Sequence, residues 1–241
     1  MLIVTKRGYE KMDKIKLGVL VGGTSIEREV SKKSCENLLA NLDENKYEIT
    51  VYHLPADGNT EWAKNIISNP PQIVLSALHG GNGENGSIQG FLHCLNIPYI
   101  GSKVLSSAIC MNKAMAKTVM KANHIQVPDH VFVMRGVDFS QYKESIKLMG
   151  FPLIVKPNRG GSSIGVIVAR NMEDIHYGIK NIIETYDDDV LIEKFIDGKE
   201  INCCVLQGEN GPEAMAVLDV KKAGSVFVYD DKYHIDEYSS D

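Results

Sequence analysis

The chain has 241 residues, 44% of them hydrophobic, so it is long enough to bury more than one ordinary globular core. Its 26 basic and 31 acidic residues give a formal net charge of −5, which excludes the basic field that would attract nucleic acid or an anionic membrane. We therefore expect small molecules or proteins as partners, and neither nucleic acid nor a membrane.

The cysteines and the apolar runs indicate the compartment. Five cysteines without paired C-x-x-C spacing argue against both a disulfide framework and a zinc site. No stretch is apolar over the length that a signal peptide or a membrane span requires. These features predict a cytoplasmic protein.

Strand and helix patterns alternate in the first part of the chain. Residues 1–14 are expected to be an N-terminal extension, and a helical pattern covers residues 25–42. Apolar strand patterns occur at 16–21, 47–53 and 72–78. Continuous apolar strands separated by helices are typical of a parallel sheet covered on both faces, so residues 15–104 are predicted to form a doubly wound α/β domain. Its working loops should lie at the carboxyl ends of the strands.

The remaining residues predict two further units. Residues 105–196 should hold one helix over 105–123, then a strand, a glycine-rich loop and a strand within 151–170, followed by a helix and a strand. That second helix and strand are predicted at 172–186 and 190–195. Residues 197–241 contain strand-like runs at 200–206, 214–220 and 225–228, which indicate the start of an antiparallel unit.

One glycine-rich segment, residues 81–86 (GNGENG), matches the dinucleotide pattern G-x-G-x-x-G. A dinucleotide site needs an acidic residue at the end of the next strand to hold the ribose, and here Gly101, Ser102 and Lys103 follow instead. We therefore reject a dinucleotide site, and a tight turn is the alternative.

A second glycine-rich segment, residues 159–165 (RGGSSIG), follows Lys156 and an apolar strand. Backbone N–H groups of such a loop can surround a triphosphate, and the lysine would add a compact positive charge. No G-K-[ST] follows, so the loop is not a Walker motif. The alternative is a β-hairpin with a glycine turn and an incidental lysine.

Several segments spread over the chain carry a resemblance to a known family. They are residues 21–31 (VGGTSIEREVS), 77–80 (ALHG), 86–90 (GSIQG), 97–102 (IPYIGS), 111–113 (MNK), 154–157 (IVKP), 191–195 (LIEKF) and 229–233 (YDDKY). Together they resemble the D-alanine:D-alanine ligase family of the ATP-grasp superfamily. The resemblance implies an α/β domain followed by an ATP-grasp domain, whose second half is expected to be truncated because the family's pattern continues beyond Asp241.

The resemblance also implies a reaction for peptidoglycan precursor synthesis. ATP phosphorylates the carboxylate of one D-alanine, and the amine of a second D-alanine displaces the phosphate. Lys113 and Lys156 match the family's phosphate-facing lysines, and Lys232 matches a third basic contact. Ser162 and Ser163 lie in the loop expected to close over the phosphates.

The nucleoside contacts implied by the resemblance lie further along the chain. Glu193, Lys194 and Ile196 match the segment that reads adenine, largely through main-chain groups, and Glu200 matches the carboxylate that binds the ribose hydroxyls. The alternative is that these charges are solvated beside a turn.

Glu27 matches the carboxylate that holds the ammonium of the first D-alanine, with Ser162 and Tyr233 completing a catalytic hydrogen-bonded trio. His79 matches a histidine near this substrate. As an alternative, residues 24–27 (TSIE) form a capping-box pattern, in which Glu27 would only satisfy the start of a helix.

The resemblance places the Mg²⁺ ligands beyond Asp241, so no metal ligand is assigned within this sequence. The acidic residues of the last segment, Asp230, Asp231, Asp236, Glu237 and Asp241, are interpreted as solvated. We accordingly expect the 241 residues alone not to join D-alanine at a useful rate. The family also favours a homodimer. The alternatives are a nucleotide-binding protein without catalysis and an ATP-grasp ligase that joins another acid and amine.

Overall fold

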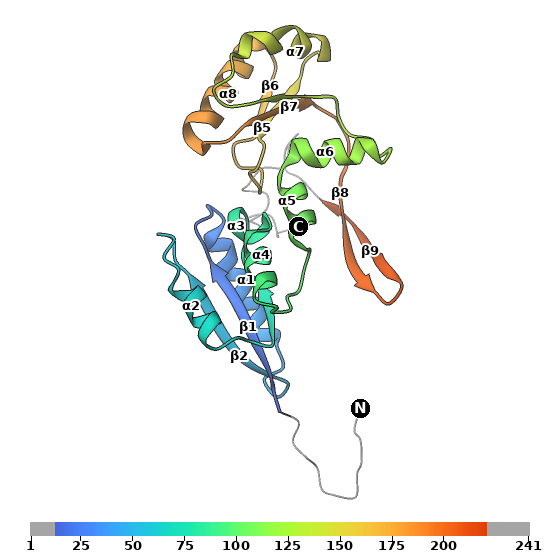
Figure 1. Ribbon diagram of the computed structural model, residues 1–241. Coiled ribbons are helices and arrows are strands. Elements are labelled where there is room, and N and C mark those ends of the chain that lie inside the picture. Colours follow the sequence, from blue (N-terminus) through green and yellow to red (C-terminus); the bar gives the residue numbers. More distant parts are fainter. Residues whose placement is uncertain (1–12, 221–241) are drawn as a thin grey trace, which may run out of the picture. The chain divides into compact units, whose positions relative to one another are not determined.

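A computed structural model describes residues 13–220 (Figure 1). Contacts divide the chain into two compact units, Met1–Asn112 and Lys113–Asp241. The expected N-terminal extension, except for its last two residues, lies outside the described residues, as does the strand expected at 225–228.

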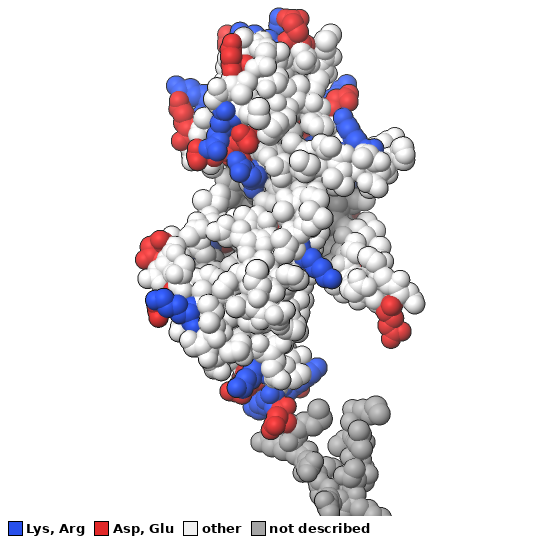
Figure 2. Space-filling view, viewed as in Figure 1, with Lys and Arg blue, Asp and Glu red and all other residues white. Residues whose placement is uncertain are grey.

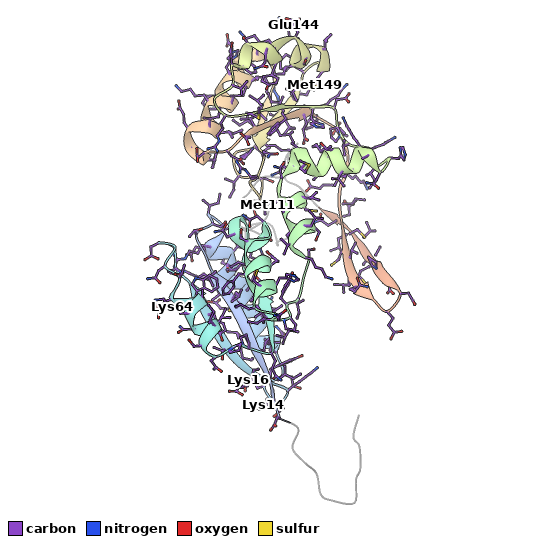
Figure 3. The ribbon with its side chains drawn as sticks, in the orientation of Figure 1. Lys14, Lys16, Lys64, Met111, Glu144 and Met149 are labelled. Carbon is purple, nitrogen blue, oxygen red and sulfur yellow. The ribbon has the colours of Figure 1, made fainter. Side chains whose placement is uncertain are left out.

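The first unit is built on a parallel sheet. Strands β1 (Ile15–Gly22), β2 (Tyr47–Leu54) and β3 (Ile73–Ser76) are ordered β2-β1-β3, and Tyr99 adds a parallel bridge to Val74. Lys14 and Lys16 project from the start of β1 in Figure 3, where the strand is exposed. The rest of β1 is buried, as its run of apolar residues predicts.

Helices cover both faces of this sheet, which confirms the doubly wound prediction. The helices of this unit are α1 (Arg28–Asn41), α2 (Glu61–Ser68), α3 (Gly81–Glu84), α4 (Ser87–Cys94) and α5 (Val104–Met111). Of these, α1 packs on one face of the sheet, and α2 and α4 pack on the other. Val19 of β1 belongs to a cluster with Cys35 of α1, whereas Leu20 belongs to a cluster with Ile66 of α2 and Leu92 of α4. Successive residues of a strand face opposite sides, so β1 contributes to both clusters.

The segment with the G-x-G-x-x-G pattern forms one helical turn, α3, rather than the tight turn given as the alternative. Gly86, the last residue of this segment, has a φ of +94°. Glycine adopts this conformation at little cost, whereas residues with a side chain rarely adopt it. A Cβ atom on Gly86 would also lie 2.7 Å from the carbonyl oxygen of Val104.

The prediction of one helix over residues 105–123 is wrong. Helix α5 ends at Met111, α6 spans Lys113–Ala122, and Asn112 between them has extended backbone. The cause is distant in sequence, because Asn158 accepts hydrogen bonds at the start of α6. Its carbonyl oxygen accepts from Lys113 N at 3.0 Å and its side-chain Oδ1 from Ala114 N at 2.9 Å.

The second unit contains an antiparallel sheet of β4 (His130–Val133), β5 (Leu153–Pro157), β6 (Ile167–Ala169) and β7 (Val190–Lys194), ordered β4-β7-β5-β6. The expected strand, loop and strand are confirmed as β5, the glycine-rich loop and β6. The expected helix is confirmed as α8 (Met172–Tyr186). The 3₁₀ turn η1 (Phe139–Tyr142), helix α7 (Lys143–Met149) and strand β4 were not assigned from the sequence.

The two faces of this sheet differ in chemistry. Val155 of β5 and Ile192 of β7 point into a core that includes Ile146 of α7 and Ile179 of α8. The next residues along the two strands, Lys156 and Glu193, lie on the opposite face. Figure 1 shows α7 and α8 on one side of the sheet and α6 on the other. The charged face therefore lies toward α6.

Strands β8 (Glu200–Gly208) and β9 (Gly211–Val220) form an antiparallel hairpin with an irregularity between Cys203 and Val205. Apolar side chains of both strands are exposed, among them Ile201 and Leu218. In the view of Figure 2 the hairpin carries few charged atoms apart from acidic ones near its turn. Within residues 13–220, no helix combines the length and the apolar character that crossing a membrane requires.

Candidate active site

Glu27 lies at the carboxyl end of β1, in the turn that enters α1, and is only 6% exposed. Its backbone N–H donates to Ser25 Oγ at 3.1 Å. Helix α1 starts at Arg28 with Glu27 as its N-cap residue, so the capping box that begins at Thr24 is in the wrong register. The capping-box alternative is therefore wrong, and the buried carboxylate lies among the loops at the end of the sheet.

His79 follows β3 and reaches α1. Its Nε2 lies 2.8 Å from Ser34 Oγ, which joins the end of β3 to the second turn of the helix. This contact fixes the position of the imidazole ring beside Gly80, which in turn adjoins Glu27. Two of the predicted substrate residues therefore lie around one loop cluster, as parallel strands predict.

A cavity of about 140 Å³ opens at this end of the sheet. His79, Gly80 and Ser25 line it together with residues that follow β2, which the sequence did not identify. These additional lining residues are Pro55, Gly58, Asn59, Thr60 and Trp62. The Asp57-Gly58 dipeptide is a turn signal that could have indicated a loop there, at the carboxyl end of β2.

In the second unit, Lys113 stands at the first position of α6 beside the glycine-rich loop. Its Nζ donates to the carbonyl oxygen of Gly160 and approaches that of Asn158 at 3.4 Å. Asn158 is fully buried, and between residues 13 and 220 its Nδ2 has no hydrogen-bond partner. The lysine is therefore held against the base of the loop that was predicted to receive phosphate.

Lys156 of β5 forms an ion pair with Glu193 of β7. The second oxygen of the same carboxylate lies 2.8 Å from Nζ of Lys117 in α6, a residue that the sequence did not identify. Burial alone raises the pKa of the Glu193 carboxyl, but the charges of Lys156 and Lys117 and their hydrogen bonds outweigh burial, so its pKa lies below the ordinary value. Glu193 is therefore ionised and buried between two cations, and it is not the solvated charge of the alternative interpretation.

The glycine-rich loop has an unusual backbone at two non-glycine positions. Ser162 has a φ of +50° and Ser163 a φ of +58°, so both occupy the left-handed region. Such a conformation costs about 1–2 kcal/mol for a residue with a side chain. Ile164 N donates to the carbonyl oxygen of Gly161 at 3.0 Å and closes a turn around the serines. Strained residues of this kind cluster at ligand-binding loops.

Asp188 holds the first residue of the loop. Its carboxylate accepts from Arg159 N at 2.6 Å and from Arg159 Nε at 2.8 Å, and it is only 6% exposed. Asp189 adds a contact of 3.5 Å to the same guanidinium. In the sequence, the run of three aspartates at residues 187–189 was the one sign of a charged contact here. Arg159, which pairs with Asp188 and Asp189, is distant in sequence, so the partner could not be read from it.

The remaining predicted residues are placed as follows. Lys194, Ile196 and Glu200 are exposed, and the N–H of Lys194 donates to the carbonyl oxygen of Asp129 at 2.9 Å. Lys232 and Tyr233 lie outside the described residues. Glu27 and Ser162 belong to different units, so the trio with Tyr233 stays a prediction.

The two clusters have complementary chemistry. The second unit offers lysine ammonium groups and a glycine-rich loop, which suit a polyphosphate. The first unit offers the imidazole of His79, which lines a small cavity, and the buried carboxylate of Glu27, which does not line the cavity but adjoins its lining residue Gly80. A carboxylate suits the ammonium group of a small molecule.

Comparisons with known proteins match two successive parts of the chain to two parts of one family. Residues 60–102 match the family model described as D-ala D-ala ligase N-terminus, and residues 119–240 match D-ala D-ala ligase C-terminus. A D-alanine–D-alanine ligase of Bacillus anthracis is 39% identical over 220 residues, which cover 91% of this chain and 68% of the relative. One from Thermoanaerobacter sp. is 35% identical over 259 residues, which cover 92% and 72%.

Solved structures give the same result. The D-alanine–D-alanine ligase from Bacillus anthracis complexed with ATP has a TM-score of 0.73 at 34% identity and covers 88% of this chain and 68% of that one. A D-Ala:D-Ser ligase from Enterococcus faecalis has a TM-score of 0.76 at 27% identity, covering 92% and 74%. With the parallel α/β unit, the glycine-rich loop and both family models in the same order along the sequence, the chain belongs to the D-alanine–D-alanine ligase family.

Proposed function

We propose that this protein is an ATP-dependent carboxylate-amine ligase that joins two D-alanine molecules through an acyl-phosphate. The observation that carries the proposal is the arrangement of Lys113, Lys156 and the glycine-rich loop at one face of the β5–β7 sheet. Relatives that bear the name D-alanine–D-alanine ligase, and one solved in complex with ATP, support it.

The charged face supplies what phosphoryl transfer needs. A carboxylate is a poor electrophile, and phosphorylation by ATP gives it a leaving group. Catalysis of such a transfer depends on positioning the phosphates and neutralising their charge. In the proposal the ammonium groups of Lys113 and Lys156 contact phosphate oxygens, and N–H groups of the loop around Ser162 and Ser163 surround them.

The first unit would hold the D-alanine that is phosphorylated. The buried carboxylate of Glu27 would bind its ammonium group, and His79, held by Ser34, would contact it from β3. The cavity of about 140 Å³ is well below the range of about 300–1,000 Å³ typical of sites for drug-sized ligands, which fits a small amino acid.

Magnesium, the dimer and the compartment belong to the proposal. Between residues 13 and 220, no group of three or more His, Cys, Asp or Glu side chains is arranged to hold a metal ion. A homodimer in the cytoplasm is proposed from the family resemblance, and sedimentation of the purified protein would test the dimer.

The test of the ligase proposal is phosphate release from ATP and Mg²⁺ by the complete gene product, with and without D-alanine. We expect release that depends on D-alanine, together with D-alanyl-D-alanine identified by mass spectrometry. Binding of ATP without release that depends on D-alanine would contradict the proposal and favour a nucleotide-binding protein without catalysis.

A second candidate joins D-alanine to a different amine. The likeness to a D-Ala:D-Ser ligase favours it. The same assay with equal concentrations of D-alanine and D-serine distinguishes the candidates, because the dominant product identifies the second substrate.

A further inference from the structure

Glu193 is shared by two lysines from different elements. Lys156 of β5 contacts Oε1, and Lys117 of α6 lies 2.8 Å from Oε2, so each carboxylate oxygen has its own cation. The side chains of Glu193 and Lys117 are 10% and 12% exposed, and that of Lys156 is 21% exposed. The outer member of the group is therefore Lys156.

Lys156 has two competing partners if it also binds phosphate. An ammonium group that turns toward a phosphate gives up part of its contact with Glu193. A buried carboxylate without a cation is strongly unfavourable, because its charge is then left uncompensated away from water. Unless another cation stayed beside Glu193, ATP binding would carry much of this cost.

We propose that Lys117 is a positioning residue that keeps Glu193 ionised while Lys156 moves from this carboxylate to a phosphate of ATP. The inference rests on the proposed function, in which Lys156 binds ATP. It deepens that function by assigning a role to a lysine that does not itself touch the nucleotide.

The geometry of α6 fits this role. Residues four apart in a helix share a face, so Lys113 and Lys117 both point toward the sheet. Lys113 contacts the loop carbonyl of Gly160, while Lys117 lies one turn further along and contacts Glu193. Asn158 fixes the start of the helix through Lys113 N and Ala114 N, so the position of Lys117 is set by a buried residue.

The other neighbours of Glu193 do not supply an equivalent charge. His130 of β4 is its cross-strand partner and shares its face of the sheet, but its Nδ1 lies 3.1 Å from the carbonyl oxygen of Pro128. Ile154 is the partner on β5, and Lys194 alternates to the other face. Among residues 13–220, the ion pairs of Glu193 are those with Lys117 and Lys156.

The first experiment compares ATP with adenosine by calorimetry, using the wild-type protein and Lys117→Met. We expect ATP affinity to fall about tenfold or more, because Lys156 is then the one cation left beside Glu193 among residues 13–220. Adenosine should lose much less, since without phosphate Lys156 stays with Glu193. Lys121→Met, an exposed lysine one turn along α6, is the matched control and should change neither affinity. Equal losses for ATP and adenosine, or no loss of ATP affinity, would overturn the inference.

The second experiment needs no nucleotide. The carboxyl ¹³C resonance of Glu193 is titrated in Lys156→Met, which imitates the departure of Lys156, and in the double variant that also carries Lys117→Met. We expect the pKa of Glu193 to stay at or below its ordinary value of 4.5 in Lys156→Met and to rise above it in the double variant.

A rise of this pKa above 4.5 in Lys156→Met alone would overturn the inference. The single variant therefore decides the matter even where the double variant does not fold. If the wild-type protein binds no ATP, the proposed function fails, whereas the titration still decides whether Lys117 is the counter-ion of Glu193.

Discussion

A Cβ atom on Gly80 would lie 2.4 Å from Oε2 of Glu27, so the glycine and the carboxylate occupy adjoining space at the end of β3. Gly80 also has a φ of +64°, which a residue with a side chain rarely adopts. The glycine therefore permits the backbone turn after β3 and leaves room for the carboxylate of Glu27. The same Cβ atom would lie 2.6 Å from Oγ of Ser25. Both close atoms belong to side chains, so a larger residue would move these side chains, the carboxylate of Glu27 among them, rather than the backbone.

Gly80→Ala should separate these two effects when it is compared with Gly101→Ala. Gly101 has a φ of +118° and no atom within 4 Å of an added Cβ, so its replacement brings backbone strain without a clash. We expect both variants to lose about 1–2 kcal/mol of unfolding free energy in urea. In the proposed function only Gly80→Ala should also weaken D-alanine binding, because it displaces Glu27. Equal D-alanine affinity in the two variants would show that the position of Glu27 does not matter.

Asp188→Asn should loosen the glycine-rich loop. The carboxylate of Asp188 accepts hydrogen bonds from the backbone N–H and the guanidinium of Arg159, whose side chain is half exposed. The substitution removes the negative charge of this acceptor. We expect trypsin to cleave after Arg159 several times faster than in the wild-type protein under native conditions. Asp187→Asn is the control, because Asp187 is 92% exposed and pairs with Arg135 instead. Unchanged cleavage in Asp188→Asn would mean that other contacts hold the loop.

The lowered pKa of Glu193 predicts how stability depends on pH. A carboxyl whose folded pKa lies below its unfolded value contributes stability that is present above the unfolded value, near 4.5, and is lost as pH falls through the folded pKa. The difference in unfolding free energy between wild type and Glu193→Gln should therefore be constant above about pH 5.5 and shrink below pH 4.5. A difference that does not vary between pH 6 and pH 3, measured by urea unfolding, would contradict the lowered pKa.

The strand, loop and strand around residues 159–165 and helix α8 could be predicted because their signals are local. Glycine and serine mark the loop, and apolar periodicity marks the helix. The break between α5 and α6 could not be predicted, since it is imposed by Asn158, which accepts from Lys113 and Ala114 across the fold.

Some residues of the candidate site could likewise be predicted from the sequence, and others could not. Lys113, Lys156 and Glu193 were identified through segments that resemble a family. Lys117 was missed because a lysine on a helix is ordinarily solvated, and its partner Glu193 is on a strand that is remote in sequence. Asp188 was missed for the same reason, since nothing near it in sequence indicates that it binds Arg159.

The proposed nucleotide site is tested most directly by the affinity of ATP for the wild-type protein and for Lys156→Met, measured by calorimetry with Lys121→Met as the control. Losing a charge-assisted contact to phosphate costs about 1.5–3 kcal/mol, so we predict that Lys156→Met binds ATP about tenfold or more weakly. The exposed Lys121 should be replaceable without effect. Equal affinities of Lys156→Met and the wild-type protein for ATP would contradict the assignment of the charged face of the β5–β7 sheet as the nucleotide site.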